Sequence, residues 1–327
     1  MLISYSKLPA VRWYQSFTAI LAVVALCFDS AAAAENQACQ LRAAPLQKTL
    51  DSVRTTYFNN LTAEPFGVAF ALHKDIAFFM NASSAYAILG VLNVTKSTPS
   101  LIHDVLPIKP KAVAQDIGQP TLTHNGRYIL VPIYNTVYVY DVEKAINGTS
   151  GALVGSLVGS AGKSAIQVTI TPDDEWAFLS MEYGNGTSGI GNIDVFHLYN
   201  PLANGTISAD YTGAIAFDYA VVGSSLSKDG RFLFVTSEVV NPADIEMINT
   251  AIYHNVSAGE GSLSILDVEI LKTDPGKSLI AAVPSGCDPV KCLVSPDDKW
   301  FGSQQEKVTG YSPSMLKKSF QITLRTL

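Results

Sequence analysis

Charge is scarce in this sequence of 327 residues: only 15% of the residues are charged, and 22 basic side chains stand against 28 acidic ones. A nucleic-acid binder needs many positive side chains to replace condensed counterions, so no nucleic-acid partner is expected. The low net charge, together with 48% hydrophobic residues, also excludes disorder as a description of the whole chain. The length suffices for one large all-β domain.

Several catalytic and metal-binding motifs are absent. None of the five histidines stands in an H-x-H or H-E-x-x-H spacing, so a histidine-rich metal centre is not expected. No G-x-S-x-G motif occurs, which excludes the α/β-hydrolase class. The sequence identifies no cofactor.

Long apolar runs are missing after the first 34 residues, and those residues have the composition of a secretory signal peptide. Lys7 and Arg12 precede the apolar run 16–28, and a stretch of alanines, 31–34, precedes Glu35. The run is shorter than the ~20 residues that span a membrane. We therefore expect removal of 1–34 and a secreted, extracellular protein without a membrane span in the mature chain.

Asparagine sequons support export independently. Seven asparagines stand in N-x-S/T without an intervening proline, and each one that is used must lie at the surface. The predicted N-glycosylation sites are Asn60, Asn81, Asn93, Asn147, Asn185, Asn204 and Asn255.

Cysteine is rare, and one of the four, Cys27, lies in the predicted signal peptide. Cys39, Cys287 and Cys292 remain, so an oxidising compartment leaves one of them unpaired. A disulfide from Cys39 to Cys287 or Cys292 would tie the N-terminal segment to the last repeat. Cys287 and Cys292 are five residues apart, which places them on opposite sides of a regular strand unless Pro289 turns the chain.

One pattern recurs from residue 65 onward. An apolar strand ends in a polar turn, a second apolar strand follows, and a third alternating strand comes after a variable loop. With a further strand-like run before the next turn, each repeat has about four strands. The turns are rich in Pro, Asp, Asn and Gly, which is typical of tight hairpins. They are residues 72–75, 123–126, 171–174, 227–230 and 295–298.

Four-stranded repeats of about fifty residues predict an all-β β-propeller with four-stranded blades, of which about five are recognisable. A β-sandwich also has many short strands, but it has no reason to repeat one turn five times. The predicted domains are the signal peptide 1–34, an N-terminal segment 35–64 that can help close the ring, and the propeller 65–327.

The repeats resemble those of the YVTN-type, lactonase-like β-propeller family. The resemblance rests on SKDGRFLFVTS (227–237), GSLSILDV (261–268) and IAAVPSGCDPV (280–290). It implies seven blades and, for some members, hydrolysis of a lactone, although this fold hosts many activities.

The fifth repeat departs from the pattern. After 297–299 the second strand shortens to Trp300 and Phe301, a third strand is expected at 308–311, and 316–327 fits no repeat. The C-terminal part is thus expected to be irregular from about 300. Since seven blades are implied, we expect an incomplete C-terminus. The alternative is a five-bladed ring closed by residues 40–58.

Two carboxylates are the best candidates for a site. Glu182 and Glu238 each stand eight residues after a turn, where Tyr134 and Ala82 stand in the second and first repeats. Such a pair could bind a divalent metal, perform acid–base catalysis or hold a cationic ligand. Solvated strand ends carrying an ordinary Glu remain the simpler interpretation.

Two functions therefore compete. The first is an extracellular or cell-surface binding or scaffold protein whose ligand is unknown. The second is a lactonase-like hydrolase or cyclising enzyme that acts on a small lactone or organic acid. In the second case Glu182 and Glu238 are the catalytic or metal-binding candidates.

Overall fold

The structure is a computed structural model. It describes residues 64–82, 87–95, 100–108, 117–160, 163–183, 190–199, 208–239, 261–286, 289–295, 300–305 and 318–323. The predicted signal peptide, the segment 35–63 and the strand expected at 308–311 lie outside these ranges. Within them, no helix is long and apolar enough to cross a membrane.

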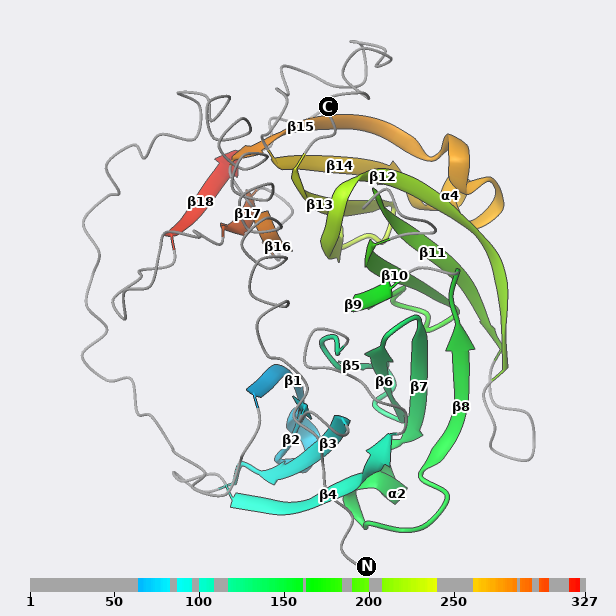
Figure 1. Cartoon of the computed structure of the whole chain (residues 1–327), viewed down its shortest axis with the longest axis vertical. Helices are drawn as coiled ribbons and strands as arrows, with labels where there is room; N and C mark the ends of the chain where they lie inside the picture. The colour runs from blue at the N-terminus through cyan, green and yellow to red at the C-terminus, as the bar shows by residue number, and fades with distance from the viewer. Residues whose placement is uncertain are drawn as a thin grey trace, which may run out of the picture. The chain divides into compact units, whose positions relative to one another are not determined.

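Four antiparallel sheets contain all the described strands (Figure 1). The first sheet comprises β1 (Glu64–Ala71), β2 (Ile76–Ala82), β3 (Ala87–Asn93) and β4 (Ser100–Ile108). The second comprises β5 (Thr121–Leu122), β6 (Tyr128–Ile133), β7 (Thr136–Asp141) and β8 (Leu153–Val158). The 3₁₀ turn η2 (Leu72–Lys74) joins β1 to β2, and helix α2 (Val142–Ile146) follows β7.

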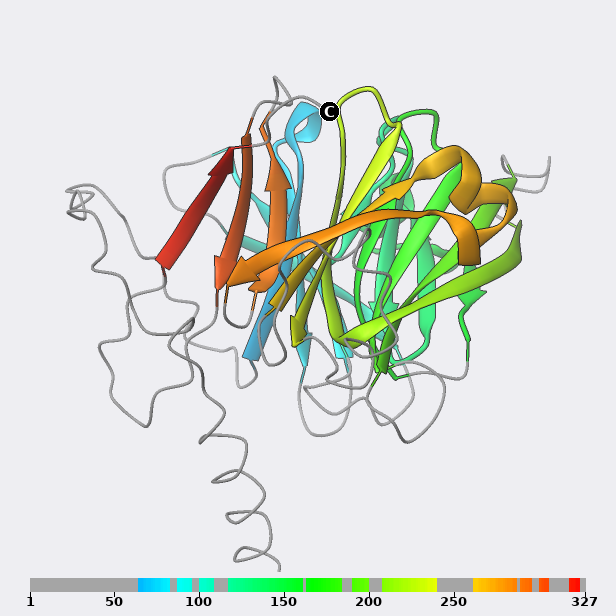
Figure 2. The ribbon, with the colours of Figure 1, turned by 90° about the horizontal axis from the view of Figure 1, so that it is seen from above.

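The third sheet has seven strands and contains two blades. It comprises β9 (Lys163–Ile170), β10 (Trp176–Tyr183), β11 (Ile190–Tyr199), β12 (Ser208–Leu226), β13 (Phe232–Val239), β14 (Gly261–Asp267) and β15 (Leu279–Gly286). Helix α4 (Val268–Thr273) and the 3₁₀ turn η4 (Pro275–Lys277) link β14 to β15 (Figure 2). The fourth sheet holds β16 (Pro289–Val294), β17 (Trp300–Gln305) and β18 (Lys318–Thr323).

The 19-residue strand β12 explains why one sheet contains two blades (Figure 1). Its first part, from Ser208, pairs with β11 as the fourth strand of the third blade. Its last part, to Leu226, pairs with β13 as the first strand of the fourth blade. The sequence predicted two separate strands here. A left-handed Ala220, with φ of 53°, lets one strand change partners without a loop.

The hydrophobic cores lie between consecutive blades. Alternate side chains of β10 show this: Phe178 packs in a core with β13 and β14, whereas Leu179 packs in a core with β6 and β7. Because both faces of the second strands are covered, all six residues of β6 are buried. The outermost strand β8 alternates between buried and exposed residues. Successive sheets that pack face to face in this way are the blades of a β-propeller, so the predicted fold class is confirmed.

In the second, third and fourth blades, the turns between first and second strands share one hydrogen-bonding pattern. A hydroxyl at the first turn position accepts from the backbone N–H five residues on and donates to the side chain two residues on. This ties both strands of the hairpin to one side chain, which explains why the sequence repeats Thr or Ser before Asp or Asn. The participating triplets are Thr123–Asn125–Tyr128, Thr171–Asp173–Trp176 and Ser227–Asp229–Phe232.

The fifth blade is more regular than the sequence predicted. Its second strand, β17, runs to Gln305, beyond the expected Trp300 and Phe301. Its third strand is β18, formed by residues expected to fit no repeat. The alternation of Phe320 and Ile322 with polar neighbours is a strand signal, but its distance from β17 along the chain hid the pairing.

Candidate functional site

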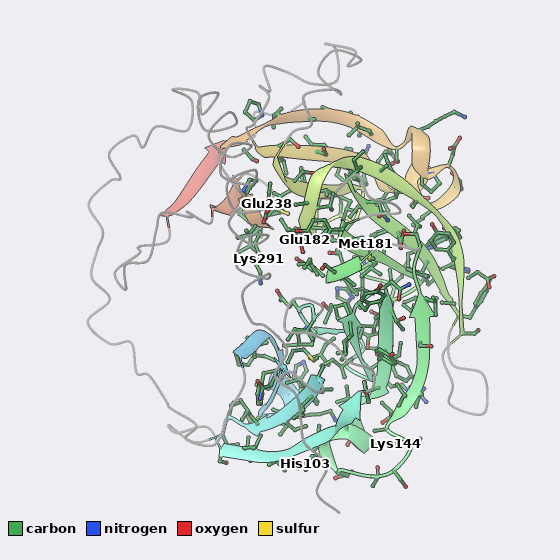
Figure 3. The ribbon with its side chains drawn as sticks, viewed as in Figure 1. His103, Lys144, Met181, Glu182, Glu238 and Lys291 are labelled. Atoms are coloured by element: carbon green, nitrogen blue, oxygen red, sulfur yellow. The ribbon has the colours of Figure 1, made fainter. Side chains whose placement is uncertain are left out.

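Glu182 and Glu238 occupy the ends of two second strands, β10 and β13, in neighbouring blades (Figure 3). Tyr183 follows Glu182 in β10, and burial, the charge and hydrogen bond of Glu182 and the charge of Glu238 together raise its pKa to about 12. Both carboxylates therefore act on one phenol at the same end of the blades.

The corresponding positions in the first two blades carry no such group. Tyr134 is 42% exposed and adopts a left-handed backbone with φ of 60°. Its carbonyl accepts a hydrogen bond from Ala165 N at 2.7 Å. Ala82 ends β2. The carboxylates thus belong to the third and fourth blades only. Within the described residues, no three His, Cys, Asp or Glu side chains gather as a metal site.

A cavity of about 500 Å³ lies among the first strands of the five blades. Side chains of β1, β5, β9, β12 and β16 line it. The residues two positions before each turn all belong to this lining: Phe70, Thr121, Thr169, Ser225 and Leu293. The residues that stand four positions before each turn are Val68, Gln119, Gln167, Gly223 and Lys291. Of these, Val68, Gln119 and Gln167 also line the cavity.

The second, third and fourth blades supply the polar wall of this cavity. Thr121 Oγ1 donates to Val168 O at 2.9 Å, and Thr169 Oγ1 lies 2.6 Å from Ser224 Oγ. Each hydroxyl thereby forms a hydrogen bond with a polar group on the first strand of the next blade. These contacts hold adjacent blades together, and they also leave hydroxyl lone pairs at the cavity.

The first and fifth blades supply the apolar wall. Val68 is 40% exposed, Phe70 54% and Leu293 72%, and all three line the cavity. Apolar side chains this accessible inside a concave site favour a ligand with an apolar side. The sequence analysis did not predict this cavity. Many of the lining residues stand at fixed distances from the turns, so the alignment of the repeats could have indicated them.

The predicted glycosylation sites differ in exposure. Asn147 is exposed at the C-cap of α2. Asn93 is half-buried, and its Oδ1 accepts from Thr95 N at 3.0 Å. Asn81 is only 5% exposed in β2, a position with no room for a glycan. Asn60, Asn185, Asn204 and Asn255 lie outside the described residues.

The cysteine that the structure describes is unpaired. Cys292 has a free thiol, 3% exposed in the core between β13 and β16. Its Sγ donates to Phe234 O at 3.4 Å, and burial raises its pKa to about 12. The disulfide proposed for Cys292 is thus not formed here. Cys39 and Cys287 lie outside the described residues.

One carboxylate, Asp194 of β11, is fully buried. Its Oδ2 accepts from Ser160 N at 2.7 Å and from Ser160 Oγ at 3.1 Å, and its Oδ1 accepts from the Asn192 amide. Burial raises the pKa of Asp194, and the hydrogen bonds from Ser160, Asn192 and Tyr211 oppose this shift. Asp194 thereby joins the loop after β8 in the second blade to the third blade.

Known structures resemble the fold. Hydrazine synthase of Kuenenia stuttgartiensis matches with a TM-score of 0.53 and 13% identity over 85% of this chain and 67% of that chain. A protein from Lactobacillus plantarum matches with a TM-score of 0.52 and 19% identity over 75% of this chain and 64% of that chain. A putative 6-phosphogluconolactonase from Bacteroides fragilis has a TM-score of 0.47 at 14% identity.

The chain spans about two thirds of the length of these structures. No family model matches the sequence, and no curated protein matches it. At these identities the likeness concerns the β-propeller fold alone.

Proposed function

We propose that this chain is a secreted, N-glycosylated β-propeller that binds a small extracellular ligand in the cavity between its inner strands. The cavity carries this proposal. Its volume of about 500 Å³ lies within the range of small-molecule sites, about 300–1,000 Å³. Its walls combine accessible apolar side chains with a few fixed polar groups, which is the composition typical of such sites. The predicted signal peptide and the exposed sequon asparagine Asn147 support the proposed secretion.

Filling the cavity tests the proposal. In Ser225→Trp the indole occupies cavity space, because Ser225 lines the cavity from β12. Protein recovered from the medium of secreting cells is screened against a fragment library by saturation-transfer NMR. We expect a set of fragments whose binding is lost in Ser225→Trp.

The matched control is Ser100→Trp, at an exposed position of β4 outside the cavity lining. It should retain the fragments. The proposal is wrong if the unmodified protein binds no fragment, or if Ser225→Trp retains all of them while remaining folded by circular dichroism.

A hydrolase is the second candidate function, favoured by the position of Glu182 and Glu238 at equivalent strand ends, where both charges raise the pKa of Tyr183. A carboxylate that exchanges a proton with a positioned phenol can assist the opening of a lactone ring. The probes are δ-valerolactone and glucono-δ-lactone, each with and without added Ca²⁺ or Zn²⁺.

If these groups catalyse hydrolysis, the double variant Glu182→Gln/Glu238→Gln should lose about 10²-fold or more of the rate. Glu175→Gln, exposed in the turn before β10, is the matched control and should keep it. Hydrolysis that survives in the double variant, or no hydrolysis by the unmodified chain, excludes this candidate.

A further inference from the structure

Two glutamines meet on the polar wall of the cavity. Gln119 and Gln167 face each other in a parallel bridge between the inner strands of the second and third blades. Gln119 N donates to Ile166 O at 2.7 Å, which fixes the register of this bridge. Both side chains line the cavity, so a ligand there meets two neighbouring amides.

The partners of these amides determine which atom each one offers. Lys291 Nζ donates to Gln119 Oε1, and an ammonium group can only donate, so the oxygen of Gln119 faces Lys291. Gln167 Nε2 donates to Ser224 O at 2.8 Å, and a carbonyl can only accept, so the nitrogen of Gln167 faces Ser224. The orientation of both amides is therefore set by the chemistry of their partners.

The two glutamines consequently offer opposite hydrogen-bonding groups. No described residue accepts from Gln119 Nε2, which leaves two N–H donors for a ligand. Gln167 Oε1 has no described donor and is left as an acceptor. Figure 3 shows the Lys291 side chain extending from β16. Its positive charge at Gln119 Oε1 polarises that amide and strengthens its N–H groups as donors.

Opposite hydrogen-bonding groups side by side suit a ligand with neighbouring hydroxyls, and the rest of the lining suits a ligand whose other side is apolar. Phe70 is 54% exposed, and its ring lines the same cavity as the two glutamines. Vicinal hydroxyls can each donate one hydrogen bond and accept another, whereas the C–H face of a sugar ring is apolar. The lining contains no Asp or Glu side chain.

We propose that the cavity binds a sugar of pyranose type, with neighbouring hydroxyls on Gln119 and Gln167 and its C–H face toward Phe70. The inference rests on the proposed binding function and specifies the chemical class of the ligand. The contacts call for a ring that carries hydroxyls on one side, and the volume of about 500 Å³ accommodates one such ring with a substituent.

Methyl glycosides test this inference. The probes are methyl β-D-glucopyranoside, methyl β-D-galactopyranoside and methyl α-D-mannopyranoside, titrated by saturation-transfer NMR against the full-length secreted protein. We expect at least one of them to bind. Gln119→Met and Gln167→Met keep the side-chain length but remove the amide, and each should weaken binding about tenfold.

Leu101→Met, on the exposed part of β4 outside the cavity lining, is the control and should leave the affinity unchanged. Cyclohexanecarboxylate serves as a competing probe with an apolar ring and a negative charge. The inference is overturned if no glycoside binds, if cyclohexanecarboxylate binds more tightly than every glycoside, or if both Gln variants bind as the unmodified protein does.

These failures are distinct from failure of the binding function. Fragments that bind, and that Ser225→Trp excludes, would leave the binding function intact while the sugar assignment falls. The absence of any cavity-dependent fragment would remove both.

Discussion

The substitution Phe178→Ala is expected to lower the free energy of unfolding by about 3–5 kcal/mol. Phe178 is fully buried in β10 and lies in the core between the third and fourth blades, with Val195 and Val235. Its removal deletes apolar contacts and leaves a void that the two flanking sheets cannot close, because both are fixed by their own ladders. Urea denaturation followed by circular dichroism gives the change.

Phe70→Ala provides the same chemical change where the ring is 54% exposed in the cavity. Phe70→Ala should lower the free energy of unfolding by no more than about 1 kcal/mol, because little buried apolar surface is lost. Equal destabilisation by the two substitutions would contradict the assignment of the cores to the spaces between blades.

Asp194→Ala is expected to destabilise the fold by about 2–4 kcal/mol, since it leaves buried donors without an acceptor. The donors affected are Ser160 N, Ser160 Oγ and the Asn192 amide. Asp194→Asn should lower the free energy of unfolding much less than Asp194→Ala does. Its oxygen can replace Oδ2, and its amide can donate to Asn192 Oδ1 once the Asn192 amide flips, because Asn192 Nδ2 now faces Asp194 and Asn192 Oδ1 has no partner among the described residues.

The same pair of variants yields a pH dependence. The pKa of Asp194 is raised in the folded state by burial, so the folded protein holds this proton more tightly than the unfolded chain does. The contribution of Asp194 to the free energy of unfolding is fully present below the pKa that Asp194 has in the unfolded chain. It is lost as pH rises through the pKa that Asp194 has in the folded protein.

Relative to Asp194→Asn, which does not titrate, the parent protein should therefore lose free energy of unfolding as pH rises from below 3.8 through that window. Urea denaturation of both proteins across this range measures the difference, and other titrating groups cancel in it. A difference that is flat, or that grows in favour of the parent at higher pH, would show that the pKa of Asp194 is not raised.

The repeat was predictable because hairpin chemistry is local. Thr171 and Asp173 are two residues apart, and the same short pattern recurs at Thr123 and at Ser227. The blade architecture follows, since four-stranded repeats have few other ways to bury both faces of their second strands. The positions of Glu182 and Glu238 at equivalent strand ends were predictable for the same reason.

The cavity chemistry was not predictable in this way. Lys291 and Gln119 are 172 residues apart, so no local pattern connects them. Their contact depends on how many blades separate β5 from β16 and on how closely the inner strands approach. The continuity of β12 was equally hidden, because a residue such as Ala220 gives no sequence signal of a left-handed backbone.

The continuous strand β12 has a mechanical consequence for the third and fourth blades. In most repeat proteins each module contacts only its neighbours, and stability is roughly a sum of separate modules and interfaces. Here one unbroken hydrogen-bonded ladder extends from β9 to β15, and a single length of chain belongs to both blades. Separating the strands of either blade therefore strains the strand that the other blade needs, so the strands from β9 to β15 form one cooperative block rather than two.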